Sequence, residues 1–231
     1  MIAAMETPHI QTASDAYAQR FAGEAGRYLL AAQEAAVRAV LADWRGGTVL
    51  DVGGGNGQLT PFLQKRASEL VVLGSDARGV ERVRRDFAGC AAATGDLLDL
   101  PFAPRSFDAV VAVRVLPHVR EWQRVLAELC RVARSTVVVE YPRPSGLHGL
   151  KQLERGTRSY RNFRDAEIAE LLRACGFEAR AWRAQFLLPM LVHRRANGAA
   201  ALRGVERAAK LLGLTQTFGS PVVVRADRRE S

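Results

Sequence analysis

The chain has 231 residues, 48% of them hydrophobic, which is long enough for one domain to bury a core without disulfides or metals. Its three cysteines, Cys90, Cys130 and Cys175, are odd in number and far apart, so we expect reduced thiols rather than a zinc site or a disulfide framework. The four histidines are scattered, so no metal site is expected, and no apolar run approaches the roughly 18 residues of a membrane span. The amino terminus lacks the pattern of a secretory signal, and we therefore expect a cytoplasmic protein.

The net charge of +9 lies entirely in the second part of the sequence. Residues 1–140 carry 16 Lys+Arg against 16 Asp+Glu, whereas residues 141–231 carry 17 against 8. A neutral first part joined to a basic second part favours an acidic substrate, an anionic carrier, nucleic acid or a membrane surface as a partner.

In chain order, residues 13–22 are typical of a short helix that contains Tyr17, and residues 26–44 are typical of a longer helix. One face of the longer helix is apolar and carries Leu29, Leu30, Ala36, Val37, Val40 and Leu41. An apolar strand over residues 48–52 follows, stops at a cluster of four glycines and leads into a helix expected over residues 59–68. This strand–turn–helix pattern is typical of a nucleotide-binding α/β unit.

A ligand site would explain why this turn is rich in glycine. Glycines at Gly53, Gly55 and Gly57 allow the backbone to adopt positive φ and a ligand to approach with no Cβ in the way. Asp51 ends the strand, where its carboxylate can accept hydrogen bonds from a ligand. Gln58 stands where a dinucleotide-binding pattern needs Gly or Ala, and no Gly-Lys-Ser/Thr follows for a phosphate loop. A glycine turn without a ligand stays open as the alternative.

A second strand over residues 69–76 ends in Asp76, 19 residues past Gly57. This is close to the offset of about 20 residues at which an acid accepts from both ribose hydroxyls. The alternative role of Asp76 is the N-cap of a helix over residues 77–86. A short strand over residues 91–94 then leads into the stretch at 95–102, Gly-Asp-Leu-Leu-Asp-Leu-Pro-Phe, and a fourth strand covers residues 106–113.

These segments, in this order over residues 47–120, resemble class I S-adenosylmethionine (SAM)-dependent methyltransferases. The pattern is most similar to the small-molecule enzymes of ubiquinone and menaquinone biosynthesis. The resemblance implies an α/β fold: a doubly wound, seven-stranded, mostly parallel sheet whose last strand is antiparallel, with N-terminal helices and a C-terminal helical insertion. It also implies SAM as the cofactor and S-adenosylhomocysteine (SAH) as the product.

By the same resemblance, Asp76 binds the ribose hydroxyls, Asp96 accepts from the adenine amino group and the backbone N–H of Leu97 meets the adenine ring. Tyr17 is a candidate lid residue, with a core aromatic as the alternative. The full set of cofactor-binding residues that the resemblance assigns is Tyr17, Asp51, Gly53, Gly55, Gly57, Asp76, Ala77, Asp96, Leu97 and Arg114.

The rest of the chain completes one expected domain, residues 1–231, with cap helices at 13–45, a SAM-binding core at 46–141, a variable substrate region at 142–215 and a last strand at 219–227. Within it we expect helices over residues 121–134, 165–175 and 197–213, and strands over 136–141, 178–188 and 221–226. The helix over 197–213 places Leu202, Val205, Ala209 and Leu212 on one face and Arg203, Arg207 and Lys210 on another. Such a helix packs on its own domain or meets a membrane or an acidic partner.

SAM carries its own electrophile, so a general base is needed only if the acceptor must lose a proton. His118, just past strand four, suits that role by its ordinary pKa of about 6.5, with a structural or substrate-contact role as the alternative. Tyr141 is the second catalytic candidate, and Glu140 and Tyr160 are further possibilities near the expected site.

Three functions are compatible with these patterns: a methyltransferase acting on O, N or C of a small molecule, an RNA or protein methyltransferase, and a non-catalytic scaffold or partner subunit. The sequence after strand four, Arg-Val-Leu-Pro, lacks the Asn/Asp-Pro-Pro-Tyr motif for amino groups on bases, and no RNA-binding module is recognisable. The acids and glycines expected to bind the cofactor are all present, which argues against a non-catalytic scaffold with a decayed cofactor site. We therefore expect a small-molecule acceptor, anionic, carrier-bound or membrane-derived, and a monomer or homodimer.

Overall fold

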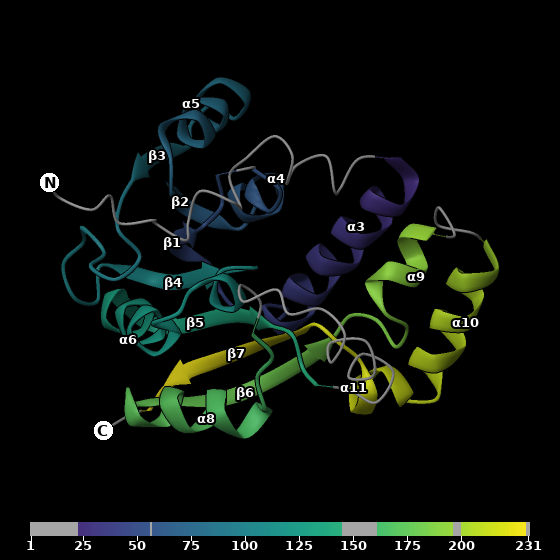
Figure 1. Ribbon diagram of the computed structural model, residues 1–231. Coiled ribbons are helices and arrows are strands. Elements are labelled where there is room, and N and C mark those ends of the chain that lie inside the picture. The colour runs from purple at the N-terminus through teal and green to yellow at the C-terminus, as the bar shows by residue number, and fades with distance from the viewer. Residues whose placement is uncertain (1–22, 56, 145–160, 196–199, 230–231) are drawn as a thin grey trace, which may run out of the picture.

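The computed structural model describes residues 23–55, 57–144, 161–195 and 200–229, which form a twisted sheet with helices on both faces (Figure 1). The helix expected over 13–22, with Tyr17, lies outside these residues, as does Tyr160. The seven strands are β1 Gly47–Val52, β2 Ala67–Gly74, β3 Ala91–Thr94, β4 Phe107–Ala112, β5 Ala133–Tyr141, β6 Phe177–Ala184 and β7 Val222–Arg228. The described helices are α3 Gly23–Val40, α4 Thr60–Gln64, α5 Ala77–Asp86, the 3₁₀ helix η1 Leu116–His118, α6 Trp122–Val132, α8 Asp165–Ala174, α9 Met190–Arg195, α10 Ala200–Leu211 and α11 Leu214–Phe218.

The strand order is β3-β2-β1-β4-β5-β7-β6, and only β7 runs antiparallel to its neighbours β5 and β6. This confirms the predicted fold class. The chain proceeds from β1 outward to β3 and then returns to place β4 on the other side of β1. The carboxyl ends of β1 and β4 therefore border a topological switch point, where open α/β sheets bind ligands.

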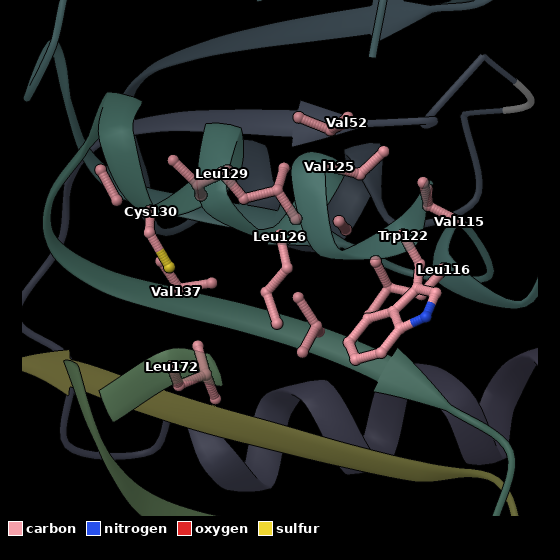
Figure 2. Close-up of a cluster of buried hydrophobic side chains, with 14 of the residues drawn as sticks. Val52, Val115, Leu116, Trp122, Val125, Leu126, Leu129, Cys130, Val137 and Leu172 are labelled. Carbon is pink, nitrogen blue, oxygen red and sulfur yellow. The ribbon is translucent and has the colours of Figure 1, made fainter. Parts of the chain in front are cut away.

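Side chains alternate between the two faces of the sheet, and each face builds its own hydrophobic cluster. On β1, Leu50 and Val52 join the cluster covered by α6 and α8, while Val49 joins the cluster covered by α3, α4 and α5. Figure 2 shows the first cluster, in which Leu126 and Leu129 of α6 lie beside β5, with Val137 of β5 and Leu172 of α8 nearby. Because Asp51 is two residues from Val49, its carboxylate points to the α3 side of the sheet.

Several predicted boundaries are shifted. The helix expected over 59–68 ends at Gln64, and β2 begins at Ala67 because that residue already pairs with Gly47 of β1. The strand expected to reach residue 188 ends at Ala184. No turn separates α6 from β5, since α6 ends at Val132 and β5 begins at the next residue.

The helix expected over 197–213 is shorter, and its predicted face is wrong. α10 ends at Leu211, and Gly213, with φ of 72°, turns the chain into α11, as glycine commonly does after a helix. Ala209 faces the protein, but Val205 and Leu212, expected on the same face, are 48% and 74% exposed. In the part of the chain that the structure describes, no helix is both long and apolar enough to cross a bilayer.

Candidate active site

The glycine turn after β1 is built around two positive-φ residues. Gly53, with φ of 80°, donates its N–H to the Leu73 carbonyl at 2.8 Å, and Gly57, with φ of 66°, donates to the Gly54 carbonyl at 2.7 Å. A Cβ at Gly53 would lie 2.5 Å from Val115, and one at Gly57 would lie 2.2 Å from Phe87, so these positions require glycine on two grounds.

The other two glycines of the turn serve the site differently from what the sequence predicted. Gly55 is not at positive φ, and a Cβ there would make only ordinary contacts, the nearest at 3.7 Å. The expected φ > 0 at Gly55 is therefore wrong. Of the two predicted reasons for a glycine at this position, only the close approach of a ligand remains. At Gly54 a Cβ would lie 2.2 Å from Oδ2 of Asp51, so that glycine makes room for the carboxylate.

A cavity opens at this turn and contains two buried oxygens without a hydrogen-bond donor. Oδ2 of Asp51 and Oε1 of Gln58 both lack a hydrogen-bond partner among the residues that the structure describes, and Asp51 is only 2% exposed. Burial raises the pKa of Asp51 to about 7, against the opposing charge of Arg114. Unpaired buried acceptors are costly unless a ligand supplies donors, and an ammonium group offers three. The cavity is lined by Gln33, Asp51, Gly53, Gly54, Gln58, Leu59, Val113 and Arg114.

Asp76 follows β2 at the neighbouring strand end and caps α5. Its Oδ1 accepts from the Gly79 N–H at 2.7 Å, the N-cap role considered for it, and Ala77 is the exposed first residue of the helix. A carboxylate has two oxygens, so one capping bond leaves capacity to accept from a ligand. The start of α5 lies against the glycine turn, since a Cβ at Gly79 would be 3.0 Å from the Gly55 carbonyl.

Asp96 stands just past β3 at the third strand end. Its Oδ1 accepts from the Leu98 N–H at 2.9 Å, its side chain is exposed, and Leu97 beside it is buried. Because β3, β2 and β1 are adjacent, Asp96, Asp76 and Asp51 follow one another along the carboxyl edge of the sheet. Adjacent strands lie about 4.8 Å apart, so the three acids form a row that an extended ligand can span.

A second buried carboxylate, Glu140 at the end of β5, lies close to the cavity. It accepts from the side-chain amides of Gln33 and Gln185 and from the backbone N–H of Arg114. Burial raises the pKa of Glu140, while the Arg114 charge and these hydrogen bonds oppose the rise. Arg114, which has φ of 60°, thus supplies positive charge to both Asp51 and Glu140.

The two candidate catalytic residues have different surroundings. His118 is the last residue of η1, in the segment that follows the end of β4 at Ala112, and its side chain is half-buried. Tyr141 is fully buried, donates its hydroxyl to Asp165 Oδ1 at 2.9 Å and packs edge-on against Phe163. Burial and the Asp165 charge raise the pKa of Tyr141, so this tyrosine is a structural link to α8 and does not fit a base.

The structure brings together all the described residues that the sequence assigned to a cofactor, at the ends of β1, β2, β3 and β4. Sequence reasoning missed Gln33, Gln58 and Gln185 as parts of the site. Gln33 left a signal, because it stands in the apolar stripe of its helix between Leu29 and Val37, where a polar residue needs a buried partner. In the described ranges, no group of three His, Cys, Asp or Glu side chains is arranged to hold a metal.

Comparison with known proteins finds the same core. Residues 50–139 match a family model described as a methyltransferase domain. The demethylmenaquinone methyltransferase of Deinococcus radiodurans is 34% identical over 111 residues, which cover 44% of this chain and 46% of that relative. The enzyme of the same name from Thermobifida fusca is 32% identical over 111 residues, covering 44% and 45%. The matched part therefore spans a little under half the length of these relatives.

Two solved structures extend the likeness over nearly the whole chain. Magnesium protoporphyrin IX methyltransferase from Synechocystis, with bound SAH, has a TM-score of 0.67 and 16% identity, covering 96% of this chain and 98% of that chain. A SAM-dependent methyltransferase from Thermotoga maritima has a TM-score of 0.69 and 16% identity, covering 97% and 100%. At such identities the likeness is one of fold.

Proposed function

We propose that this chain, whose residues 50–139 match the family model of a methyltransferase domain, is a class I methyltransferase that transfers a methyl group from SAM to an oxygen, nitrogen or carbon atom of a small molecule. One observation carries the proposal. The carboxylate of Asp51 is buried at the switch point of the sheet, beside a glycine turn, with an oxygen that accepts from no donor in the described ranges. The amino-acid end of SAM supplies a cation that matches this carboxylate.

The donors and acceptors along the sheet edge fit the remaining parts of SAM. Asp51 and Gln58 would hold the ammonium group, Asp76 would accept from the ribose hydroxyls, and Asp96 from the adenine amino group. The buried Leu97 would contribute an apolar contact and its backbone N–H to the ring. When bound, SAM supplies a methyl group on a sulfonium, which is electrophilic without further activation. The chain's task is then to orient the acceptor and exclude water.

His118 is the residue we propose to contact the acceptor. It lies past the β4 end, on the same edge of the sheet as the acids, and is half-buried rather than sealed in the core. An imidazole is the side chain most often used to remove a proton from a hydroxyl or amine near neutral pH. Glu140 and Tyr141 are already engaged by Gln33, Gln185 and Asp165, which favours positioning roles for them.

The acceptor we propose is a small, anionic or membrane-derived molecule. The Deinococcus and Thermobifida relatives are named for a menaquinone precursor, which supports a small-molecule acceptor. Arg161 supports an anionic group: its backbone N–H bonds to the Pro117 carbonyl at 3.1 Å, next to His118, and its side chain, whose guanidinium is paired with Glu167 at 3.0 Å, is still 47% exposed. Arg155 and Arg158, the other two cations of this segment considered from the sequence, lie outside the described residues. No observation favours an RNA or protein acceptor, or a scaffold.

Calorimetric titration with SAH tests the cofactor assignment. The native chain should bind SAH in the micromolar range, and Asp76→Ser should weaken binding at least tenfold. Serine keeps an N-cap oxygen for α5 but removes the second acceptor, so the melting temperature should stay nearly unchanged. Asp86→Ala, at the exposed end of the same helix, is the matched control and should bind as the native chain does. A native chain that gives no SAH binding would refute the proposal.

The acceptor assignment is tested with labelled SAM and a panel of small hydroxy acids, phenols and amines. Arg161→Glu should raise KM for an anionic acceptor without altering the SAH dissociation constant. Unchanged acceptor kinetics in this variant would reject the anionic group while leaving the cofactor assignment intact.

A further inference from the structure

The outer face of α10 exposes large apolar side chains to solvent. Leu211 is 89% exposed, Leu212 is 74% exposed and Val205 is 48% exposed. Single exposed leucines are ordinary on protein surfaces, but neighbouring ones on one helix face mark an interaction site. The exposure continues past Gly213 into α11, where Leu214 and Phe218 are 39% and 54% exposed. We call these five residues the α10–α11 apolar surface.

The helix has three distinct faces at about 100° per residue. Leu202, Glu206 and Ala209 share the face turned toward the protein, and Glu206 and Ala209 are buried. A second, exposed face carries only apolar and small residues, Ala201, Gly204, Val205, Ala208 and Leu211, and the exposed Leu212 follows directly after the helix. Between them lies a strip of three cations, Arg203, Arg207 and Lys210.

The inner face is fixed, so the outer face cannot simply turn inward. The buried carboxylate of Glu206 accepts from the backbone N–H groups of Leu187 and Leu188, at 2.9 Å each, and contacts His193 Nε2 at 3.0 Å. These bonds tie α10 to α9 and to the segment after β6. Rotating the helix would break these bonds and leave the N–H groups of Leu187 and Leu188 without their acceptor, which is costly.

Hydrogen bonds hold α11 to the domain, as they hold α10. The Arg143 guanidinium donates to the carbonyls of Gln216 and Thr217, at 3.1 and 2.8 Å, and pairs with Asp165 at 2.9 Å. Leu214 and Phe218 therefore project from an element held by the domain. Their exposure is a property of the fold.

Charge identifies the kind of partner. Arg203 is tied to Glu24 of α3 at 2.5 Å, but Arg207 and Lys210 are exposed and form no ion pair with any residue that the structure describes. The second part of the chain holds the whole net charge of +9. A second copy of this chain would bring these cations together, whereas an anionic surface would neutralise them. An apolar stripe bordered by Lys and Arg is the arrangement of a helix that lies in a membrane interface.

We propose that the α10–α11 apolar surface inserts into the headgroup region of an anionic lipid bilayer, with Arg207 and Lys210 among the lipid phosphates. α10 lies on the far side of α9 from α3 (Figure 1). The proposal stands apart from the proposed reaction, because binding needs neither cofactor nor acceptor.

Flotation with vesicles tests the proposal on the full chain. The native protein should float with vesicles of phosphatidylcholine and phosphatidylglycerol at 3:1 in 0.1 M salt, and much less with phosphatidylcholine alone. Leu211→Ser/Leu212→Ser should lower the partition coefficient at least tenfold, and Arg207→Glu/Lys210→Glu should do likewise. Lys65→Glu/Arg85→Glu makes the same charge change at exposed positions in α5 and just after α4, and should leave at least half of the binding.

Four outcomes overturn the proposal. The native chain fails to bind anionic vesicles, the serine variant binds as well as the native chain, or the control charge variant loses as much as Arg207→Glu/Lys210→Glu. The fourth is a concentration-dependent dimer, seen by light scattering, that becomes a monomer in Leu211→Ser/Leu212→Ser, while the native chain does not bind vesicles. The surface would then bind a second copy of this chain. Thermal melts of each variant show that it is folded, which is expected because the changed side chains are exposed. SAH binding should be unchanged in all of them.

Discussion

The side-chain amide of Gln33 donates to both carboxylate oxygens of Glu140, at 3.1 Å each, across 107 residues of sequence. This buried contact fastens α3 to the carboxyl end of β5. Gln185, after β6, donates to the same carboxylate from another direction. Since Gln33 also lines the cavity, Glu140 sets the position of one cavity wall.

Gln33→Ala should therefore destabilise the fold. The buried carboxylate loses a donor, which costs about 1–3 kcal/mol. Because the Gln33 hydrogen bond lowers the pKa of Glu140, it favours the ionised carboxylate, and the loss should be larger at pH 8 than at pH 5. Chemical denaturation at both pH values measures it. Gln64→Ala, which removes an exposed bond to the Ala88 carbonyl, is the control and should cost less than about 0.5 kcal/mol. An equal loss in both variants would contradict the expectation.

Asp51→Asn should stabilise the free protein while impairing its site. The pKa of Asp51 is about 7 in the folded chain and 3.8 ordinarily, so the folded state binds more protons between these values. Folding stability then falls as pH rises from about 4 to about 7. Removing the charge should recover up to about 4 kcal/mol at pH 8 and almost nothing at pH 4. Melting curves at the two pH values test this; a variant less stable than native at pH 8 would show that the carboxylate is already well paired.

SAH affinity should depend on the ionisation of Asp51. If this carboxylate holds the ammonium group of the ligand, only the ionised form binds well. With a pKa of about 7, the ionised fraction falls roughly tenfold from pH 8 to pH 6, so the dissociation constant should rise by about the same factor. Asp51→Asn should bind weakly at both pH values, with no such dependence. A flat profile in the native chain would assign the ammonium group to another acceptor.

Much of the core could be predicted because local chemistry fixes it. The strand Ala91–Thr94 and the helix Ala77–Asp86 have the predicted bounds. Asp76 caps the helix and so fixes its start, and the polar residues on either side of a short apolar run fix the ends of a strand. The order of acids and glycines placed the cavity at the correct strand ends. The φ of Gly55 was not predictable, because any glycine in a turn is permitted either sign.

The errors lie where distant segments meet. α10 has two apolar stripes, and its pattern alone cannot say which one faces the domain. The choice depends on Glu206, which is buried because it satisfies the N–H groups of Leu187 and Leu188 from another segment. The partnership of Gln185 with Glu140 is likewise set by where β6 ends. A pattern of single residues carries no information on such pairings.

The glycine turn offers a matched pair of variants. Gly54→Ala would place a Cβ 2.2 Å from Asp51 Oδ2 and displace a buried carboxylate. It should therefore lower the free energy of unfolding by about 1–3 kcal/mol and also weaken SAH binding. Gly55→Ala meets only ordinary contacts at 3.7 Å, so its stability should change by less than about 0.5 kcal/mol. Its SAH affinity should nevertheless fall at least tenfold, because the methyl group stands where the ligand approaches. Native affinity in Gly55→Ala would place the ligand away from this turn.

Cys175 should be the most reactive of the three thiols. Cys130 and Cys175 are distant in sequence, but the packing of α6 on α8 brings them together, and the Cys130 thiol donates a hydrogen bond that lowers the pKa of Cys175 to about 7, assisted by the Arg228 charge. Burial raises the pKa of Cys90. At pH 7.5 an iodoacetamide label should modify Cys175 faster than Cys90, as peptide mass spectrometry would show. Cys130→Ala removes the donor and should slow the reaction several-fold, whereas Cys90→Ala should leave the rate unchanged. Equal rates in the native protein and Cys130→Ala would mean that Cys175 gains its reactivity from exposure alone.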